Sequence, residues 1–350
     1  MPEPGGFDHP GLVQVLGFSP RKRRLLQGFL PGATLRPIVD PRDVHAGDTV
    51  AVWASSPQER DLASRGDLTV WRVEDGFLRS VGLGARLVRP LSWVVDRRGI
   101  HYDPTRPSDL EAMLVAGGFE TALLERAQVL RARIVAAAIS KYNMGSQQQW
   151  PGLSAGARGR SVVLVVGQVE ADAAVRRGAT GIASNVALLR AARARHPDAW
   201  RVYKPHPDVV AGLRAAGCGE DRAGALCDEM VINAPITDVL EVVHDVHVLT
   251  SLTGFEALLR GRRVHCHGQP FYAGWGLTTD ALSSPRRTRR ASLDELVAAA
   301  LLCYPRYVTR EDGRLCEAEQ TLQDLMDWRR RDNGEARWWQ RALRPVLRHE

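Results

Sequence analysis

The chain has 350 residues, of which 44% are hydrophobic and 25% are charged, as in an ordinary soluble globular protein with room for two domains. Its formal net charge of +7 favours an anionic partner such as a nucleotide or a phospholipid surface. No apolar run approaches the ~20 residues of a membrane span, and the N-terminus has no secretory signal pattern, so we expect a cytoplasmic protein.

The cysteines predict neither disulfides nor a metal site. There are five of them, an odd number without a CxxC pair. Cys266 stands between His265 and His267 in an expected strand, where alternate residues point to opposite faces. We therefore expect no metal in this protein.

The first half of the chain alternates between strand and helix patterns. Residues 48–53 and 68–73 predict strands, and a helix is expected between them. Two such βα units favour a parallel sheet. Residues 91–95 and 100–102, joined by a tight turn at 96–99, predict a β-hairpin.

A helix is then predicted to start after Ser108. Ser108 is a suitable N-cap, and Glu111 three residues later would complete a capping box. The helical pattern continues to Ile139. The Gly-, Ser- and Gln-rich stretch 145–160 predicts an interdomain linker.

The stretch around which the second half is organised is a βαβ unit. Residues 161–166 predict a buried parallel strand, and residues 200–203 predict a second strand after a helix. Asp172 follows the first strand, and Lys204 and His206 follow the second. Because open α/β sheets bind ligands at the carboxyl ends of their strands, we expect the functional site here.

The alternation continues beyond this unit. The later expected strands and helices are, in chain order, strand 231–233, helix 235–243, strand 246–249, helix 255–259, strand 263–266 and helix 292–302.

The segment Lys204-Pro-His-Pro207 is typical of a phosphate-binding loop. Its prolines restrict the backbone, so that a rigid loop presents His206 with a second cation nearby. Only three of the 47 basic residues are lysines, Lys22, Lys141 and Lys204, which suggests that these positions require a compact ammonium group. The alternative is an ordinary solvent-exposed loop histidine.

A second phosphate-binding candidate is the segment 250–256, which joins a strand to a helix through Ser251, Thr253 and Gly254. Free backbone N–H groups at a helix start bind phosphate. Glu256 in the first turn could accept hydrogen bonds from ribose hydroxyls. The alternative is an ordinary N-capped helix.

Two carboxylates at strand ends, Asp172 and Glu74, suit glycosyl transfer if they face one cleft, with one as nucleophile and the other as acid/base. Taken singly, each is more often a helix cap or an ion-pair partner.

The roles of two basic segments stay open: residues 21–24 could contact phosphate or form a solvated helix face, and the Trp- and Arg-rich segment 328–350 could contact a membrane or pack as a helix.

Ordered segments over about residues 50–307 resemble the bacterial capsule-polysaccharide β-Kdo transferases of the KpsC type. The segments that carry the resemblance are 72–84, 90–103, 140–143, 168–172, 204–208, 250–258 and 270–277. Together they form a specific pattern, whereas no single one would. Members of the family carry two such modules in tandem, and this chain has room for one.

The resemblance implies an α/β fold with two Rossmann-like domains facing a cleft, as in GT-B glycosyltransferases. It implies transfer of Kdo from CMP-β-Kdo, without a further cofactor, to a lipid-linked or glycan acceptor with retention of configuration. It implies Asp172 as nucleophile, with Glu74, or alternatively Asp75, as acid/base on the acceptor. The donor-binding residues that it implies are Gln168, Lys204, His206, Ser251, Thr253, Gly254 and Glu256, and cleft residues Lys141 and Asn143 have no assigned step.

The expected domains are 1–157 on the acceptor side, 158–327 on the CMP-sugar side and a basic segment 328–350. We expect the protein at the inner face of the cytoplasmic membrane and without a nucleic-acid partner.

The chain departs from the family pattern at Gly167, usually an aspartate, and at Ala174, usually a serine. Alternatives are a glycosyltransferase for another nucleotide sugar and a non-catalytic capsule assembly or export module.

Overall fold

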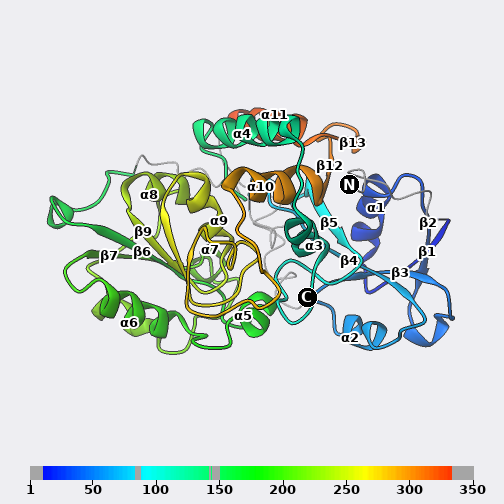
Figure 1. Ribbon diagram of the computed structural model, residues 1–350, viewed down its shortest axis with the longest axis horizontal. Coiled ribbons are helices and arrows are strands. Elements are labelled where there is room, and N and C mark those ends of the chain that lie inside the picture. Colours follow the sequence, from blue (N-terminus) through cyan, green and yellow to red (C-terminus); the bar gives the residue numbers. More distant parts are fainter. Residues whose placement is uncertain (1–10, 83–87, 142, 144–149, 333–350) are drawn as a thin grey trace.

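The computed structural model describes residues 11–82, 88–141, 143 and 150–332. It has two α/β halves, each built on one sheet, with helices bridging them (Figure 1). This confirms the expected α/β fold with two sheets. Residues 145–149 of the expected linker and residues 333–350 of the expected C-terminal segment lie outside the described residues.

The first sheet has seven strands in the order β13-β12-β5-β4-β3-β1-β2. The strands from β1 to β4 are parallel, as predicted, whereas β5 runs antiparallel to β4. The strand bounds are β1 Leu12–Leu16, β2 Thr34–Ile38, β3 Thr49–Trp53, β4 Thr69–Asp75, β5 Ser92–Asp96, β12 Pro305–Val308 and β13 Leu315–Cys316.

The hairpin predicted between 91–95 and 100–102 is wrong, because β5 pairs with β4 and β12 and no strand forms at 100–102. The Asp96 carboxylate accepts hydrogen bonds from the backbone N–H groups of Arg98, Gly99 and Asp109 at 2.8–2.9 Å. These bonds turn the chain away from the sheet and into the following helix.

The second sheet has six parallel strands in the order β11-β10-β9-β6-β7-β8. Its central strand β6 is buried along its whole length, as its β-branched sequence predicts. The bounds are β6 Val162–Val166, β7 Trp200–Lys204, β8 Glu229–Met230, β9 Asp245–Val248, β10 Arg263–Cys266 and β11 Thr279–Asp280. The strand predicted at 231–233 therefore lies two residues earlier, at β8.

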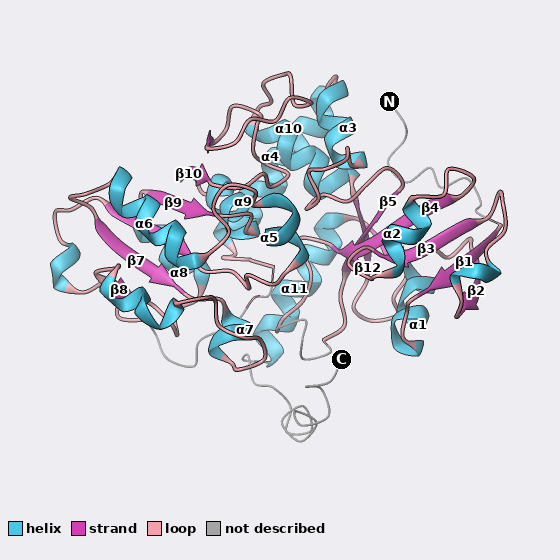
Figure 2. Ribbon diagram, turned by 90° about the horizontal axis from the view of Figure 1, so that it is seen from below, coloured by secondary structure: helices cyan, strands magenta, loops and turns pink. Residues whose placement is uncertain are grey.

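Helices cover both sheets, and Figure 2 shows α9, α5 and α11 between them. The α-helices are α1 Pro20–Phe29, α2 Gln58–Ala63, α3 Asp109–Ala116, α4 Thr121–Ala136, α5 Ala173–Gly178, α6 Asn185–Arg195, α7 Pro207–Val210, α8 Ile236–Val242, α9 Leu252–Leu259, α10 Leu293–Val297 and α11 Ala318–Asp332. Short 3₁₀ segments occur at Pro41–Asp43, Ala155–Ala157 and Glu220–Ala225.

Two predicted helices are interrupted. Gly117 and Gly118 adopt positive φ angles of 61° and 70°, which end α3 and start a new helix, α4. The helix predicted for 292–302 begins with a complete capping box of Ser292 and Glu295, but it continues as a π-helix over Ala298–Cys303.

The chain returns to the first sheet after the second is complete. Strands β12 and β13 fall within the range expected for the second domain, yet they extend the first sheet from β5. The domain limits stay a prediction.

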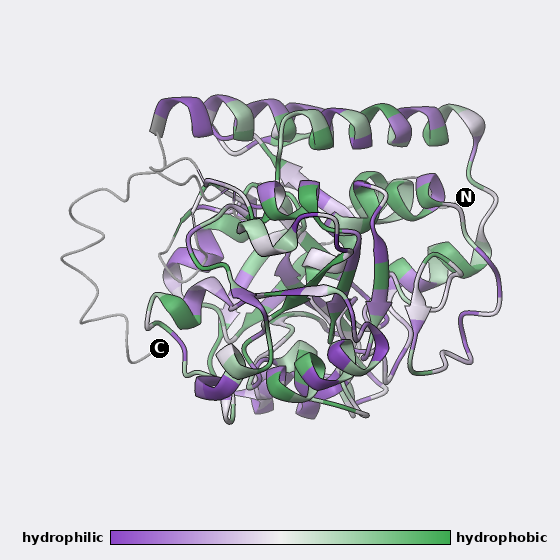
Figure 3. Ribbon diagram, turned by 90° about the vertical axis from the view of Figure 1, so that its left-hand side faces the viewer, coloured by the Kyte–Doolittle hydropathy of each residue, from purple (hydrophilic) through white to green (hydrophobic). Residues whose placement is uncertain are grey.

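The helices along the top of the molecule, α4 and α11 in Figure 1, alternate hydrophobic and hydrophilic residues (Figure 3).

One hydrophobic core runs through both halves. It includes Val94 of the first sheet and Val162 of the second. At the junction, Phe77 stacks on Phe271 with 4.8 Å between ring centroids. Because buried apolar contacts continue from one sheet to the other, the two halves form a single packed unit.

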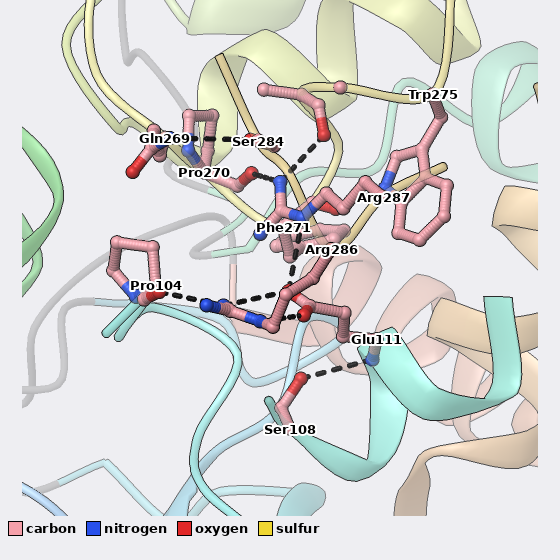
Figure 4. Close-up of polar contacts among 12 residues, drawn as sticks. Pro104, Ser108, Glu111, Gln269, Pro270, Phe271, Trp275, Ser284, Arg286 and Arg287 are labelled. Carbon is pink, nitrogen blue, oxygen red and sulfur yellow. Dashed lines mark hydrogen bonds and ion pairs between the residues drawn. The ribbon is translucent and has the colours of Figure 1, made fainter. Parts of the chain in front are cut away.

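Ion pairs also stabilise the junction between the two halves. Ser108 caps α3 as predicted, by accepting a hydrogen bond from the Glu111 N–H at 3.0 Å, but the Glu111 side chain does not complete the capping box. Instead, its two oxygens bind Arg286 at 2.6 Å and Arg287 at 3.1 Å (Figure 4). Arg287 also donates to the carbonyls of Pro270 and Ala273. This buried carboxylate therefore joins the halves.

Candidate functional site

A cleft of about 2140 Å³ lies between the two sheets and is lined by residues of both. A pocket for one drug-sized ligand encloses about 300–1,000 Å³, so this cleft has room for two substrates. All but one of the predicted site residues line it. These are Glu74, Asp75, Lys141, Asn143, Gln168, Asp172, Lys204, His206, Ser251, Thr253 and Glu256.

Asp172 lies at the end of the loop that follows β6, as the N-cap residue of α5. A capping aspartate usually accepts a hydrogen bond from the first helical turn, but the Asp172 side chain makes no capping bond. Its backbone N–H donates to the Val169 carbonyl at 3.0 Å, which fixes the turn. The carboxylate is therefore held at the cleft without being used by its own helix.

Gln168 positions this loop. Its side-chain amide donates to Thr250 Oγ1 at 3.0 Å, and its side-chain carbonyl accepts from the Thr250 backbone N–H at 2.9 Å. Its backbone N–H and carbonyl also pair with the amide of the buried Asn185, at 2.9 Å each. Because both ends of the side chain are engaged, Gln168 ties the β6 loop to the β9 loop.

His206 caps the short helix α7 and faces the cleft. Its Nδ1 accepts a hydrogen bond from the Asp208 N–H at 3.1 Å, so in the neutral ring the proton is on Nε2. Burial lowers the pKa of His206, while the charges of Asp208 and Asp172 act in the opposite direction. The arrangement presents a neutral N–H donor to a ligand.

Lys204, the last residue of β7, lies beside it. Its ammonium donates to the Ala234 carbonyl at 2.6 Å and, at 3.4 Å, to that of Ile232. Burial lowers the pKa of Lys204 to about 8. The ammonium is therefore fixed in place at the cleft, and it keeps its charge through neutral pH.

The N-terminus of α9 lines the same side of the cleft, the wall formed by the second sheet and its loops. Ser251 caps this helix by accepting a hydrogen bond from the Thr253 N–H at 3.2 Å. Gly254 does not line the cleft; it lets α9 approach Tyr272, because a Cβ there would collide with the Tyr272 hydroxyl, which donates to the Ser251 carbonyl. Gly254 thus supports the helix start and does not itself contact the cleft.

Two carboxylates from the end of β4 face the cleft in different ways. Asp75 accepts hydrogen bonds from Arg79 Nε at 2.6 Å and Trp93 Nε1 at 3.1 Å. Glu74 accepts one from the Asp75 backbone N–H at 3.0 Å. Burial, followed by the charge of Asp75, raises the pKa of Glu74 to about 7. Glu74 is therefore poised to exchange a proton near neutral pH.

The loop after α4 also lines the cleft, between the residues of the two sheets. The Lys141 backbone N–H donates to Glu256 Oε1 at 2.8 Å, and burial raises the pKa of Glu256. Asn143 is 3% exposed; its amide donates to the Ser80 carbonyl and accepts from the Ser140 N–H. Asn143, at φ 46°, thus holds this loop in place.

Sequence reasoning missed several residues of the first-sheet wall. Arg21 and Lys22 of α1 line the cleft, and the Lys22 ammonium lies 3.7 Å from the centre of the Trp53 ring. The predicted basic patch at 21–24 was the available signal, but only the fold brings it to Glu74. Tyr102 also lines the cleft, and its buried hydroxyl has no hydrogen-bond partner among the described residues.

The departure at Gly167 has a steric reason. A Cβ at Gly167 would lie 2.6 Å from the Tyr203 hydroxyl and 3.0 Å from Pro205 Cα, so no larger residue fits while Tyr203 stays in place. Tyr203 in turn donates a hydrogen bond to Glu220. Nothing in the structure explains the alanine at 174, which lines the cleft.

No helix within the described ranges is both long and apolar enough to cross a membrane.

Two solved structures are similar to this chain over nearly all of its length. The Thermosulfurimonas dismutans KpsC β-Kdo 2,7 transferase is 37% identical, with a TM-score of 0.75, and the match covers 90% of this chain and 98% of that one. The β-Kdo 2,4 transferase of KpsC from the same organism is 33% identical, with a TM-score of 0.78, and covers 91% and 98%.

Two curated proteins are also similar to this chain. The capsule polysaccharide modification protein LipA of Neisseria meningitidis serogroup A is 44% identical over 76% of this chain. The lipopolysaccharide-processing protein LpsZ of Rhizobium meliloti is 42% identical over the same share. The chain spans 37% of LipA and 60% of LpsZ. The family model described as capsule polysaccharide biosynthesis protein matches residues 49–309, and the chain therefore belongs to that family.

Proposed function

We propose that this protein is a retaining β-Kdo transferase that moves Kdo from CMP-β-Kdo to a Kdo-bearing or lipid-linked glycan in capsule polysaccharide biosynthesis. The observation that carries the proposal is the meeting of Asp172, Lys204, His206 and the start of α9 in one cleft. The likeness to two KpsC transferases over about nine-tenths of the chain supports the choice of sugar.

The second-sheet wall suits the nucleotide. His206 Nε2 donates to the phosphate of CMP, Lys204 adds a fixed positive charge, and α9 directs its N-terminus at the same group. Ser251 at this helix start and Glu256 in the second turn of α9, not the first turn as expected, both line the cleft and seat the nucleoside. The Lys204 charge and these hydrogen-bond donors stabilise the phosphate as it takes the electron pair of the broken bond, and no metal ion is needed for that.

Asp172 performs the first displacement. Its carboxylate attacks the anomeric carbon of Kdo as the bond to the CMP phosphate breaks, which leaves Kdo esterified to Asp172 with inverted configuration. The absence of a capping bond leaves the carboxylate oxygens available for this attack.

Glu74 performs the second step. It takes the proton of the acceptor hydroxyl as that oxygen attacks the anomeric carbon and the bond to Asp172 breaks, which restores the original configuration. The raised pKa of Glu74 suits a base that works near neutral pH, whereas the Asp75 carboxylate is engaged by Arg79 and Trp93. We therefore assign the base to Glu74 and a positioning role to Asp75.

The acceptor occupies the first-sheet wall. A Kdo-bearing acceptor is anionic, and Arg21 and Lys22 supply positive charge there, with the half-buried Trp53 beside Lys22. The net charge of +7 also favours the anionic inner face of the cytoplasmic membrane, where a lipid-linked acceptor would lie. Sedimentation with vesicles of anionic and of neutral phospholipid tests this; equal binding to both would contradict it.

The decisive experiment is intact mass spectrometry with CMP-Kdo. Glu74→Gln should slow the second step, so the protein should gain the mass of one esterified Kdo, and peptide mapping should place the sugar on Asp172. Wild type should release CMP only slowly until a Kdo-terminated acceptor is added, and the new linkage should be β by NMR. Release of the nucleotide from another sugar nucleotide but not from CMP-Kdo would overturn the choice of donor, and no release with any donor would favour an assembly module.

A further inference from the structure

A cluster of three histidines lies outside the cleft, in the second half of the molecule. His196 directly follows α6, His247 lies in β9, and His265 lies at the paired position in β10. One ring nitrogen of each lies within 4.8 Å of the others. None of the three lines the cleft, so the cluster is separate from the transferase site.

Each of the three rings has one nitrogen without a protein partner among the described residues. His196 Nε2, His247 Nε2 and His265 Nδ1 are buried and accept or donate no hydrogen bond among the described residues. Buried polar atoms are nearly always hydrogen-bonded, so three orphaned nitrogens in one cluster require an explanation. Each neutral imidazole has one nitrogen with a free lone pair, which is the form that binds a metal ion.

The opposite ring nitrogens of two of them are held. His265 Nε2 lies 2.9 Å from Asp245 Oδ1, and Asp245 is itself fixed by Arg263 at 2.6 Å. His247 Nδ1 lies 3.0 Å from His267 Nε2. A histidine that binds a metal typically donates its other N–H to a carboxylate or another acceptor, which sets the tautomer and the ring orientation. The same pattern is present here before any ion is added.

We propose that His196, His247 and His265 form a binding site for one divalent transition-metal ion of the zinc type. Three imidazoles match zinc, cobalt, nickel or copper and do not match magnesium or calcium, which prefer oxygen. Zinc–nitrogen distances of about 2.0–2.1 Å in a tetrahedron need roughly 3.3 Å between nitrogens. The nitrogens of the cluster lie within 4.8 Å of one another and the rings of His247 and His265 are stacked, so both rings turn toward the ion when it binds. Water supplies the fourth ligand on the half-exposed side of His196.

Cys266 takes no part, because its buried side chain belongs to the core on the other face of β10. His247 and His265 are stacked with 4.4 Å between centroids, and His196 meets both edge-on. The ion would therefore join the end of α6 to β9 and β10. Its role is structural, since it stabilises the nucleotide-side sheet without entering the cleft.

Cobalt titration of the full-length, untagged protein, after dialysis against a chelator, tests the site. One Co²⁺ per chain should bind and give the visible absorption of a tetrahedral complex, and Zn²⁺ should displace it and raise the Tm. His196→Gln should weaken binding at least about tenfold, as should Asp245→Asn through His265. His45→Gln, a change at an exposed histidine far along the sequence, is the matched control.

His196→Cys separates metal loss from misfolding, because a thiolate is itself a zinc ligand and should retain tight binding. Unchanged affinity in His196→Gln, or binding below half an ion per chain in the wild type, would overturn the proposal. If His196→Gln does not fold, loss of Co²⁺ absorption in His247→Gln or its retention in His196→Cys decides the matter in the same way.

Discussion

The two walls of the cleft are built differently. On the second sheet, Lys204 ends a parallel strand, and Asp172 and Ser251 lie in the loops that follow two others, so the order of the strands brings all three to one edge. On the first sheet, Glu74 ends a strand, Lys141 belongs to a loop after α4 and Arg21 belongs to α1. The wall that we propose for the nucleotide depends on topology, and the wall that we propose for the acceptor depends on tertiary packing.

Their electrostatics differ as well. Burial raises the pKa of Glu74 on the first-sheet wall and lowers the pKa values of Lys204 and His206 on the other. One wall therefore offers a base and the other offers donors for a phosphate. Substitutions on each wall should change different steps, and this is how the comparison can be tested.

The largest effect is expected at Asp172. Asp172→Asn keeps the shape but removes the nucleophile, so kcat for CMP release should fall by about 10³-fold or more. Donor binding, measured by calorimetry with CMP, should stay within about twofold. Asp198→Asn, on the exposed surface of the same half, is the control. A surviving glycosyl adduct in Asp172→Asn would exclude this residue as nucleophile.

Glu74→Gln should lower kcat by about 10²-fold or more and change its pH dependence. A base must be ionised, so wild-type transfer should rise as the pH rises through about 7, the pKa of Glu74. The variant should lack that rise. Asp75→Asn should keep the rise but move it to lower pH, because the charge of Asp75 helps to raise the pKa of Glu74. If Asp75→Asn loses the rise and Glu74→Gln keeps it, the two roles are reversed.

The same substitution should affect stability in the opposite direction. Because the pKa of Glu74 is raised above its ordinary 4.5 in the folded protein, folding favours the protonated form, and stability falls as the pH rises from about 4.5 through 7. Glu74→Gln cannot ionise, so its Tm should exceed that of the wild type at about pH 8, and the difference should shrink toward pH 4.5. A lower Tm at pH 8 would contradict the assigned burial.

A smaller effect is expected at His206. His206→Ala removes one hydrogen bond to an anion, worth about 1.5–3 kcal/mol, so kcat/KM for CMP-Kdo should fall by about 10- to 10²-fold. KM for the acceptor should not change. His45→Ala serves as the control for loss of a histidine. An effect confined to the acceptor would place the nucleotide on the other wall.

The smallest effect is expected at Arg21. Arg21→Gln should raise KM for a Kdo-bearing acceptor by a few-fold, since single exposed charge contacts are worth about 0.2–1 kcal/mol, and the effect should shrink in high salt. Arg24→Gln, on an exposed part of the same helix that does not line the cleft, should have no effect. Equal effects of both variants would indicate a general charge effect.

The difference between the walls also explains what the sequence predicts. Residues 161–207 predict β6, β7 and the polar strand ends, because local β-branched runs and proline signals determine them. Arg21 could be recognised only as part of a basic patch, since its approach to Glu74 depends on α1 packing against the sheet. The failed hairpin has the same cause: β5 meets β12, a partner that no local pattern indicates.

The histidine cluster is a second feature that the sequence alone does not predict. His265 and His267 are visible as neighbours in the sequence, but His196 and His247 come from other elements and meet His265 only through strand register and the end of α6. Spacing along the chain therefore argues against a metal, whereas the placement of the rings in space argues for one.

The late return of the chain to the first sheet has a consequence for synthesis. Until β12 is made, the edge of β5 has no partner, and an unpaired strand edge invites aggregation. The first half therefore cannot finish folding on the ribosome before the second half has emerged. Truncation near residue 157, although it leaves β1 to β5 intact, should produce a protein that depends on chaperones for its solubility.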